Sequence, residues 1–237
     1  MLMLYYGYGM YFDPTYLLVI AGLLLSLAAS AMVNTTFEKY AKVRSMTGMT
    51  GAEAARSVLQ AAGIYDVHVE KVAGKLTDHY DPRNKVLRLS ESTYASASVA
   101  AICVAAHECG HAIQDQKKYG PLVLRSILVP LANFGSAAAW PIFLIGLVMS
   151  LKPLLTLGIL FFSLAVCFQL VTLPVEFNAS QRAVQILESA RVLEKSEIDG
   201  GRKVLRAAAM TYVASLAASV LQLLRLIILA GGRRNRD

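Results

Sequence analysis

The hydrophobic pattern of the chain consists of four long apolar stretches separated by polar regions. The first stretch, Tyr16–Val33, contains no charged residue, and about 18–20 helical residues cross the hydrocarbon core of a bilayer. The other stretches cover 121–150, 154–175 and 207–230. The pattern therefore predicts a mainly α-helical integral membrane protein with about four membrane segments.

The second and third apolar stretches are separated only by a short turn at Lys152-Pro153, which predicts a helical hairpin. The stretch 121–150 is longer than one straight crossing and contains Pro130 and Pro141, so we expect a kinked or tilted helix there. A hairpin returns the chain to the side on which it started. The residues before 121 and after 175 are therefore expected on the same side of the membrane.

The polar region Asn34–Gly120 contains helix and strand patterns that predict a small α+β domain. Thr50-Gly51-Ala52-Glu53 has the pattern of a capping box, which predicts a helix that ends near Gly63. Residues 67–73 alternate like a strand, and 76–90 predict a β-hairpin whose turn is 81–84.

A long helix is expected from Ser90 to about Gln116, with Ser90 or Ser92 at its N-cap. We therefore divide the chain into an N-terminal tail and membrane helix (1–33), a polar α+β region that contains the long helix (34–120), a membrane hairpin (121–175), a polar helical region (176–206) and a C-terminal membrane helix with a basic tail (207–237).

Composition supports lipid as the solvent of the long helices, because only 16% of the residues are charged against about 25% in soluble domains. The net charge of +7 comes without a basic, aromatic-interleaved patch or a known nucleic-acid motif, so no nucleic-acid partner is predicted. The chain has three cysteines, Cys103, Cys109 and Cys167, with no CxxC pair. This odd number predicts no disulfide framework and favours a reducing compartment.

The distribution of positive charge predicts the orientation in the membrane. Lys and Arg side chains near the ends of the apolar stretches are concentrated on the side that holds 34–120 and 176–206, which favours a cytoplasmic polar domain. The basic tail after 230 argues in the opposite direction if the last stretch spans. The residues before Tyr16 lack a positively charged segment and a cleavage pattern, so the first helix is predicted to be retained.

The strongest chemical signal is an HExxH motif, His107-Glu108-Cys109-Gly110-His111, within the predicted helix. Residues four apart lie on one helix face, so both imidazoles can bind a single Zn²⁺ ion. The glutamate can then act as general base on a zinc-bound water. A chance pair of helical histidines is the alternative, but burying two imidazoles and a carboxylate in an alanine-rich helix without a shared role is costly.

A catalytic zinc usually has three protein ligands and one position for water. Glu176 is the preferred third ligand, because it follows the second arm of the hairpin and returns to the side of the HExxH helix. Asp115, one turn beyond His111, is the runner-up, while Cys103 and Glu188 are weaker alternatives.

The segments HECGHAIQD, PVEFNASQRA and HYDPRNKVLRLS, together with the membrane hairpin, resemble the YugP-like neutral zinc metallopeptidase family of bacterial membranes. More distantly the layout resembles the HtpX-like membrane peptidases. The resemblance implies a small zincin-like α+β catalytic domain in the bacterial inner membrane, with His107, His111 and Glu176 as zinc ligands and Glu108 as base. Ser180 stands where the distant pattern has Asp, so Ser180 or Asn178 is a candidate for orienting a ligating histidine, as is Asp115.

The predicted function is hydrolysis of peptide bonds in protein substrates by this membrane-embedded zinc site. A zinc-dependent hydrolase of lipids or other amides, or a non-enzymatic membrane scaffold, is the alternative. The stretch Lys85–Ser90 is a candidate edge strand for an extended substrate. His68, His79 and Tyr80 are candidates for polarising the scissile carbonyl. The oligomeric state is not predicted.

Overall fold

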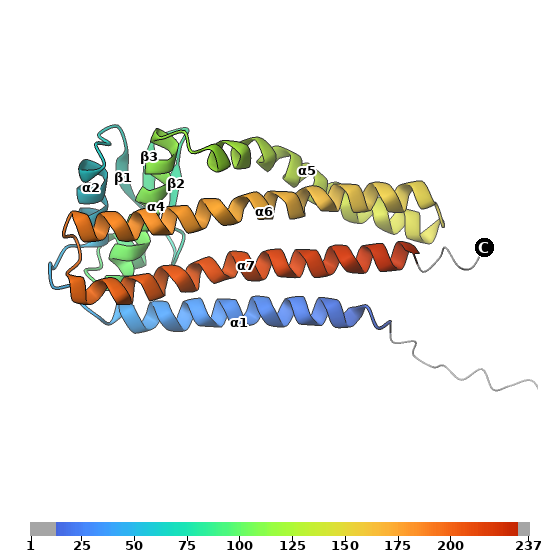
Figure 1. Ribbon diagram of the computed structural model, residues 1–237, viewed down its shortest axis with the longest axis horizontal. Helices are drawn as coiled ribbons and strands as arrows, with labels where there is room; N and C mark the ends of the chain where they lie inside the picture. Colours follow the sequence, from blue (N-terminus) through green and yellow to red (C-terminus); the bar gives the residue numbers. More distant parts are fainter. Residues whose placement is uncertain (1–12, 232–237) are drawn as a thin grey trace, which may run out of the picture.

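The computed structural model describes residues 13–231, so the N-terminal tail 1–12 and the basic tail 232–237 lie outside the described residues. Four long helices, α1 (Tyr16–Ala41), α5 (Gly120–Val148), α6 (Lys152–Ser189) and α7 (Lys195–Gly231), run along the long axis of the molecule. The remaining elements form a polar domain at one end of this bundle (Figure 1).

Each long helix is long and apolar enough to cross a membrane, and these are the four such helices within 13–231. Their outer faces expose large apolar side chains such as Leu24, Ile127 and Phe134. Exposure of that many apolar side chains would be unfavourable in water, so the bundle is built for lipid. The predicted number of membrane segments thus agrees with the candidate spans.

Helices α5 and α6 form the expected hairpin, with α5 bent before it packs along α6 (Figure 1). Pro130 and Pro141 lie inside α5, where each removes a backbone donor and favours bending. The structure differs from the sequence expectation in the next two helices. The polar segment after 176 continues α6 without a break, and α7 runs unbroken through the expected boundary near 207.

The sheet of the polar domain has three strands, β1 (His68–Val72), β2 (His79–Asp81) and β3 (Val86–Ser90), in the order β1-β3-β2. The hairpin β2–β3 is antiparallel as expected, but β1 pairs with β3 in parallel on the other side. The stretch proposed above as an exposed edge is therefore the central strand, and that prediction is wrong. The edges are β1 and β2.

The long helix expected from Ser90 is interrupted. It consists of α3 (Glu91–Tyr94) and α4 (Val99–Gln116), and Ser98 is the N-cap of α4, accepting a hydrogen bond from the Ala101 amide at 3.2 Å. The backbone between the two helices pairs with residues 43–45 instead of continuing a helical ladder. These tertiary hydrogen bonds satisfy the groups that an uninterrupted helix would have used.

Side-chain hydrogen bonds form at the starts of two helices, and one of them is a capping box. The predicted capping box at the start of α2 (Gly51–Ala61) is confirmed, since Thr50 accepts from the Glu53 amide at 3.3 Å and the Glu53 carboxylate accepts from the Thr50 amide at 2.8 Å. At α1 the carboxylate of Asp13 accepts from the Thr15 amide at 2.9 Å, and the helix begins at Tyr16.

The core of the polar domain lies between α2, α4, β3 and the ends of α6 and α7. Its fully buried side chains include Val58, Leu87, Ile102 and Leu187. Alanines of α4 let this helix pack closely on its neighbours, so the HExxH motif is held rigidly at the junction of polar domain and bundle.

Candidate metal centre

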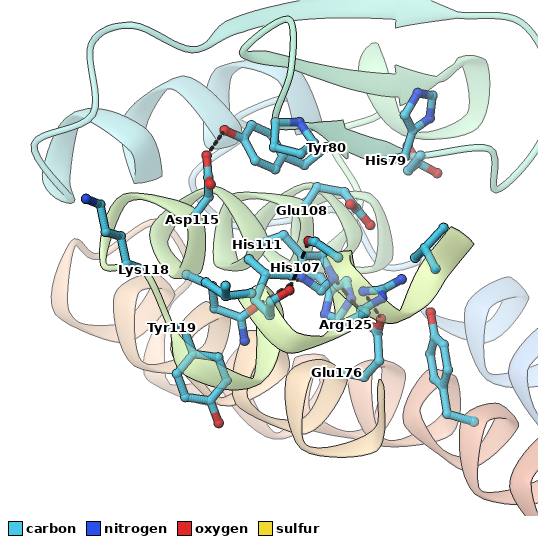
Figure 2. Close-up of a pocket in the computed structure, with 18 residues that line it drawn as sticks. His79, Tyr80, His107, Glu108, His111, Asp115, Lys118, Tyr119, Arg125 and Glu176 are labelled. Atoms are coloured by element: carbon cyan, nitrogen blue, oxygen red, sulfur yellow. Dashed lines mark hydrogen bonds and ion pairs between the residues drawn. The ribbon is translucent and has the colours of Figure 1, made fainter. Parts of the chain in front are cut away.

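The HExxH motif lies in the second half of α4, where it presents both imidazoles on one face (Figure 2). The rings of His107 and His111 are edge to face, with centroids 4.8 Å apart. Each side chain is mostly buried, with 15% and 13% of its surface exposed. The two rings therefore converge as the helical spacing requires.

Glu176 reaches the two rings from α6. Its Oε2 atom lies 3.2 Å from His107 Nε2 and 3.5 Å from His111 Nε2. The approach of the two helices depends on Gly110, because a Cβ at that position would lie 2.5 Å from the Ala179 carbonyl oxygen. The small residue in the middle of the motif thus lets α6 bring its carboxylate to α4.

The three donor atoms fit a zinc ion. Donors about 2.0–2.1 Å from a tetrahedral zinc ion lie about 3.3 Å from one another, and the two nitrogen–oxygen separations are close to this value. All three atoms lie within 4.8 Å of one another, and two imidazoles with one carboxylate form a donor set that suits zinc. The geometry can accept a metal ion with little movement.

The orientation of His111 is set by Gln114. The Gln114 amide nitrogen donates to the Val175 carbonyl at 2.8 Å and to Asn178 Oδ1 at 3.0 Å, so its oxygen faces the ring. His111 Nδ1 lies 3.0 Å from this oxygen and must donate to it. In the neutral ring the lone pair of His111 is therefore on Nε2, the nitrogen that faces Glu176.

His107 has a comparable partner in Ser180, whose Oγ lies 3.1 Å from His107 Nδ1. With a metal on Nε2, the Nδ1–H group donates to this hydroxyl. Asn178 does not reach either ring itself. Its Oδ1 accepts from Gln114 and, at 2.7 Å, from Arg182 Nε. Asn178 thus acts on His111 only through the amide of Gln114.

The charges at the site favour a cation. Burial lowers the pKa of His111, but the hydrogen bond to Glu176 and the charge of Glu108 raise it, and the net pKa is above its usual value. The same two carboxylates that favour the protonated ring would favour a divalent ion between the donor atoms.

A cavity of about 420 Å³ opens beside the three donor atoms. Glu108 extends into the space between α4 and β2, on the side of His79 (Figure 2). The opposite wall comes from α5 through Leu122, Val123 and Val129. A carboxylate next to a candidate metal and an open cavity has the position that a general base needs.

Two further lining residues from the membrane helices lie beside Glu176. Arg125 of α5 forms an ion pair with Glu176, with Nη1 3.1 Å from Oε1, and Tyr212 of α7 lines the cavity beside the same carboxylate. Sequence reasoning missed both, and it missed Gln114. Signals were present: Arg125 is a lone charge in an apolar stretch, and Gln114 lies three residues after His111 on the same helix.

Several sequence candidates are placed elsewhere. Asp115 accepts from the Tyr80 hydroxyl at 2.9 Å and pairs with Lys85 at 2.6 Å, so its carboxylate faces the sheet and not the donor group. Cys103 is buried, and burial raises the pKa of its thiol to about 12. The Oε2 atom of Glu188 lies 3.8 Å from Arg202 Nη2, so this carboxylate is paired with an arginine. The expectation that one of these could replace Glu176 is not supported by their positions.

The candidates for polarising a carbonyl are also separated by the fold. His79 and Tyr80 line the cavity from β2, while His68 lies on β1 at the opposite edge of the sheet. The hydroxyl of Tyr80 is engaged by Asp115, and burial together with this carboxylate raises the pKa of Tyr80. Tyr80 is therefore directed away from the donor atoms.

Comparison with known proteins identifies the class. A family model described as "Putative neutral zinc metallopeptidase" matches residues 15–231, and the chain belongs to this family. The resemblance found in the sequence is thereby confirmed. The chain is similar to "Putative membrane protease YugP" of Bacillus subtilis (strain 168), with 52% identity over 212 residues that cover 90% of this chain and 94% of the relative. No solved structure gives a significant match.

Proposed function

We propose that the protein is a membrane-embedded zinc endopeptidase in which His107, His111 and Glu176 bind the metal and Glu108 is the general base. The observation that carries this proposal is the convergence of two imidazole Nε2 atoms and one carboxylate oxygen from α4 and α6. Gln114 supports it, because its fixed amide leaves the Nε2 lone pair of His111 free for a ligand bond.

Each residue has a separate task in the reaction. A bound zinc ion would polarise the scissile carbonyl and make water acidic enough to be deprotonated near neutral pH. Glu108 takes the proton from the attacking water and delivers it to the leaving amine nitrogen, so that the peptide bond is cleaved without a covalent enzyme intermediate. Ser180 and Gln114 keep the two rings in place during this cycle.

The substrate binds along β2. This strand is an edge of the sheet, and its residues His79 and Tyr80 line the cavity next to Glu108. An extended peptide can add to such an edge by backbone hydrogen bonds, which a lipid cannot make. This edge replaces Lys85–Ser90 in the earlier expectation, and it favours a peptide over a lipid substrate.

The catalytic unit formed by α4 and the sheet is zincin-like, and it lies on the cytoplasmic side of the bacterial inner membrane. The orientation rests on Lys and Arg side chains at the polar-domain end of the bundle, among them Lys39, Lys42 and Arg206. The α5–α6 turn and the outer ends of α1 and α7 lie at the other end (Figure 1).

Metal analysis and substrate assays on purified protein in detergent test the proposal. Wild type is expected to hold about one zinc per chain, and His107→Ala and Glu176→Ala to lose most of it. Glu108→Gln should keep the zinc but cleave casein or a peptide library about 10²–10⁴-fold more slowly. Phospholipid hydrolysis without peptide cleavage would favour the lipid hydrolase, and a zinc content unaffected by Glu176→Ala would remove this residue from the ligand set.

A further inference from the structure

The two oxygens of the Glu176 carboxylate face different groups. Oε2 faces the two histidines, whereas Oε1 lies 3.1 Å from Arg125 Nη1. Glu176 is almost fully buried, with 2% of its side chain exposed, while Arg125 reaches it from the cavity wall formed by α5. Figure 2 shows Arg125 and Glu176 side by side at one end of the histidine pair.

A glutamate that binds a metal can offer one oxygen or both. A hydrolytic zinc site needs one ligand position left for water, and a second carboxylate oxygen would compete for that position. A guanidinium held on one oxygen occupies its lone pairs with a charge-assisted hydrogen bond and keeps it turned away from the histidines. The contact between Arg125 and Oε1 has this arrangement.

We propose that Arg125 is a positioning residue that restricts Glu176 to offering a single oxygen to the metal, and so keeps one ligand position open for water. The inference rests on the metal site proposed above. It gives a role to Arg125, whose charge in the apolar helix α5 would otherwise be costly in lipid.

A purely structural role for Arg125 fits the structure less well. Helices α5 and α6 already pack tightly elsewhere, where Gly135 faces the Phe161 backbone and Gly158 faces Phe143. The ion pair is not needed to hold this hairpin. A cation next to the ligand carboxylate also repels a divalent metal, so a residue serving only to retain zinc would not be an arginine.

The test uses Arg125→Gln and Arg125→Lys in the full chain, with zinc affinity measured by chelator competition and coordination by the visible spectrum after cobalt substitution. Arg125→Gln is expected to bind zinc at least as tightly as wild type, because a repelling charge is lost and both oxygens become available. Its cobalt absorption should weaken, as a change from four to five ligands requires. Its kcat should fall about 10- to 100-fold with little change in KM. Arg125→Lys should restore much of the cobalt absorption.

Lys118→Gln is the matched control, because it removes one positive charge from the lining of the same cavity. Its cobalt spectrum should equal that of wild type. The proposal is overturned if Arg125→Gln leaves the cobalt spectrum unchanged, or if it loses zinc in parallel with activity. The proposed function fails separately, if wild type and His107→Ala bind cobalt equally or if metal-loaded wild type cleaves no peptide.

Discussion

The polar domain and the helix bundle differ in how far they bury their apolar side chains. In the polar domain the apolar side chains are hidden, as Leu87 and Ile102 illustrate, whereas in the bundle Leu24 and Ile127 are about 60% exposed. The difference follows from the solvent, because lipid gives no hydrophobic reason to bury a leucine. The domain is therefore held by burial, and the bundle by close approach of its helices.

The two regions also differ in how fully the amides of their glutamine side chains are hydrogen-bonded. Gln114 in α4 uses both ends of its amide, while Gln169 Oε1 and Gln222 Nε2 in the bundle are buried polar atoms without a hydrogen-bond partner among the described residues. An unsatisfied amide atom is costly in either environment. Because the Gln114 amide in α4 is hydrogen-bonded at both ends, its position is fixed more strictly than the positions of Gln169 and Gln222 in the bundle.

Deleting leucine side chains gives the largest expected contrast. Leu87→Ala in the fully buried core should destabilise the protein by about 2–5 kcal/mol, because it leaves a cavity. Leu24→Ala should change stability by less than about 0.5 kcal/mol, because Leu24 faces lipid in any membrane-inserted state. Thermal unfolding in detergent measures both. Equal losses would contradict the division into two solvents.

Replacing one glutamine in each region tests whether the hydrogen bonds of Gln114 position the His111 ring. Gln114→Ala frees the His111 ring and should weaken zinc binding about 10- to 100-fold, equivalent to about 1.4–2.7 kcal/mol. Gln169→Leu in the bundle should leave zinc affinity unchanged. Chelator competition reads out both variants, and an unchanged affinity for Gln114→Ala would show that the amide does not orient the ring.

Glycines test how rigid each region is. Gly110→Ala places a methyl group against the Ala179 backbone, and this clash should exceed the helix-propensity gain and destabilise the protein by about 1–2 kcal/mol. Gly22→Ala meets Ala218 at 3.1 Å, where two helices in lipid can separate slightly, so its effect should be smaller. Unfolding midpoints compare the two. A larger loss for Gly22→Ala would place the rigid contact in the bundle.

A smaller destabilisation than that of Leu87→Ala is expected at a surface cap of the polar domain. Thr50→Ala removes the capping box of α2 and should cost about 1 kcal/mol of stability. Zinc content should not change, since α2 contributes no donor atom. Hydrogen exchange of the first turn of α2 locates the effect, and a simultaneous loss of zinc would contradict the independence of cap and metal site.

Local signals made part of this architecture predictable. The HExxH spacing, the apolar stretches and the Thr50–Glu53 pair each depend on neighbours within one helix, and the sequence records such neighbours directly. The position of Glu176 near α4 could be predicted from the sequence for a similar reason, because a hairpin must return the chain to the side of α4.

Long-range hydrogen bonds account for what the sequence did not reveal. The parallel pairing of β1 with β3 and the break before Ser98 depend on partners far along the chain. The same holds for the bond between Gln114 and Val175, which fixes His111. Neither periodicity nor a local motif encodes these contacts, so the central place of β3 and the orientation of the His111 ring could not be predicted from the sequence.

The continuous course of α6 connects the candidate metal site to the candidate membrane span of the same helix. Its apolar half lies in the bundle, and the same continuous helix, which contains Pro174, carries Glu176 to the histidines, which lie on α4 outside the candidate spans. A spanning helix adapts to membrane thickness by changing its tilt. Because Gly110 packs on the Ala179 backbone and Gln114 donates to the Val175 carbonyl, α4 is tied to α6 on both sides of Glu176, so a change of tilt reaches the candidate metal site through a packed junction.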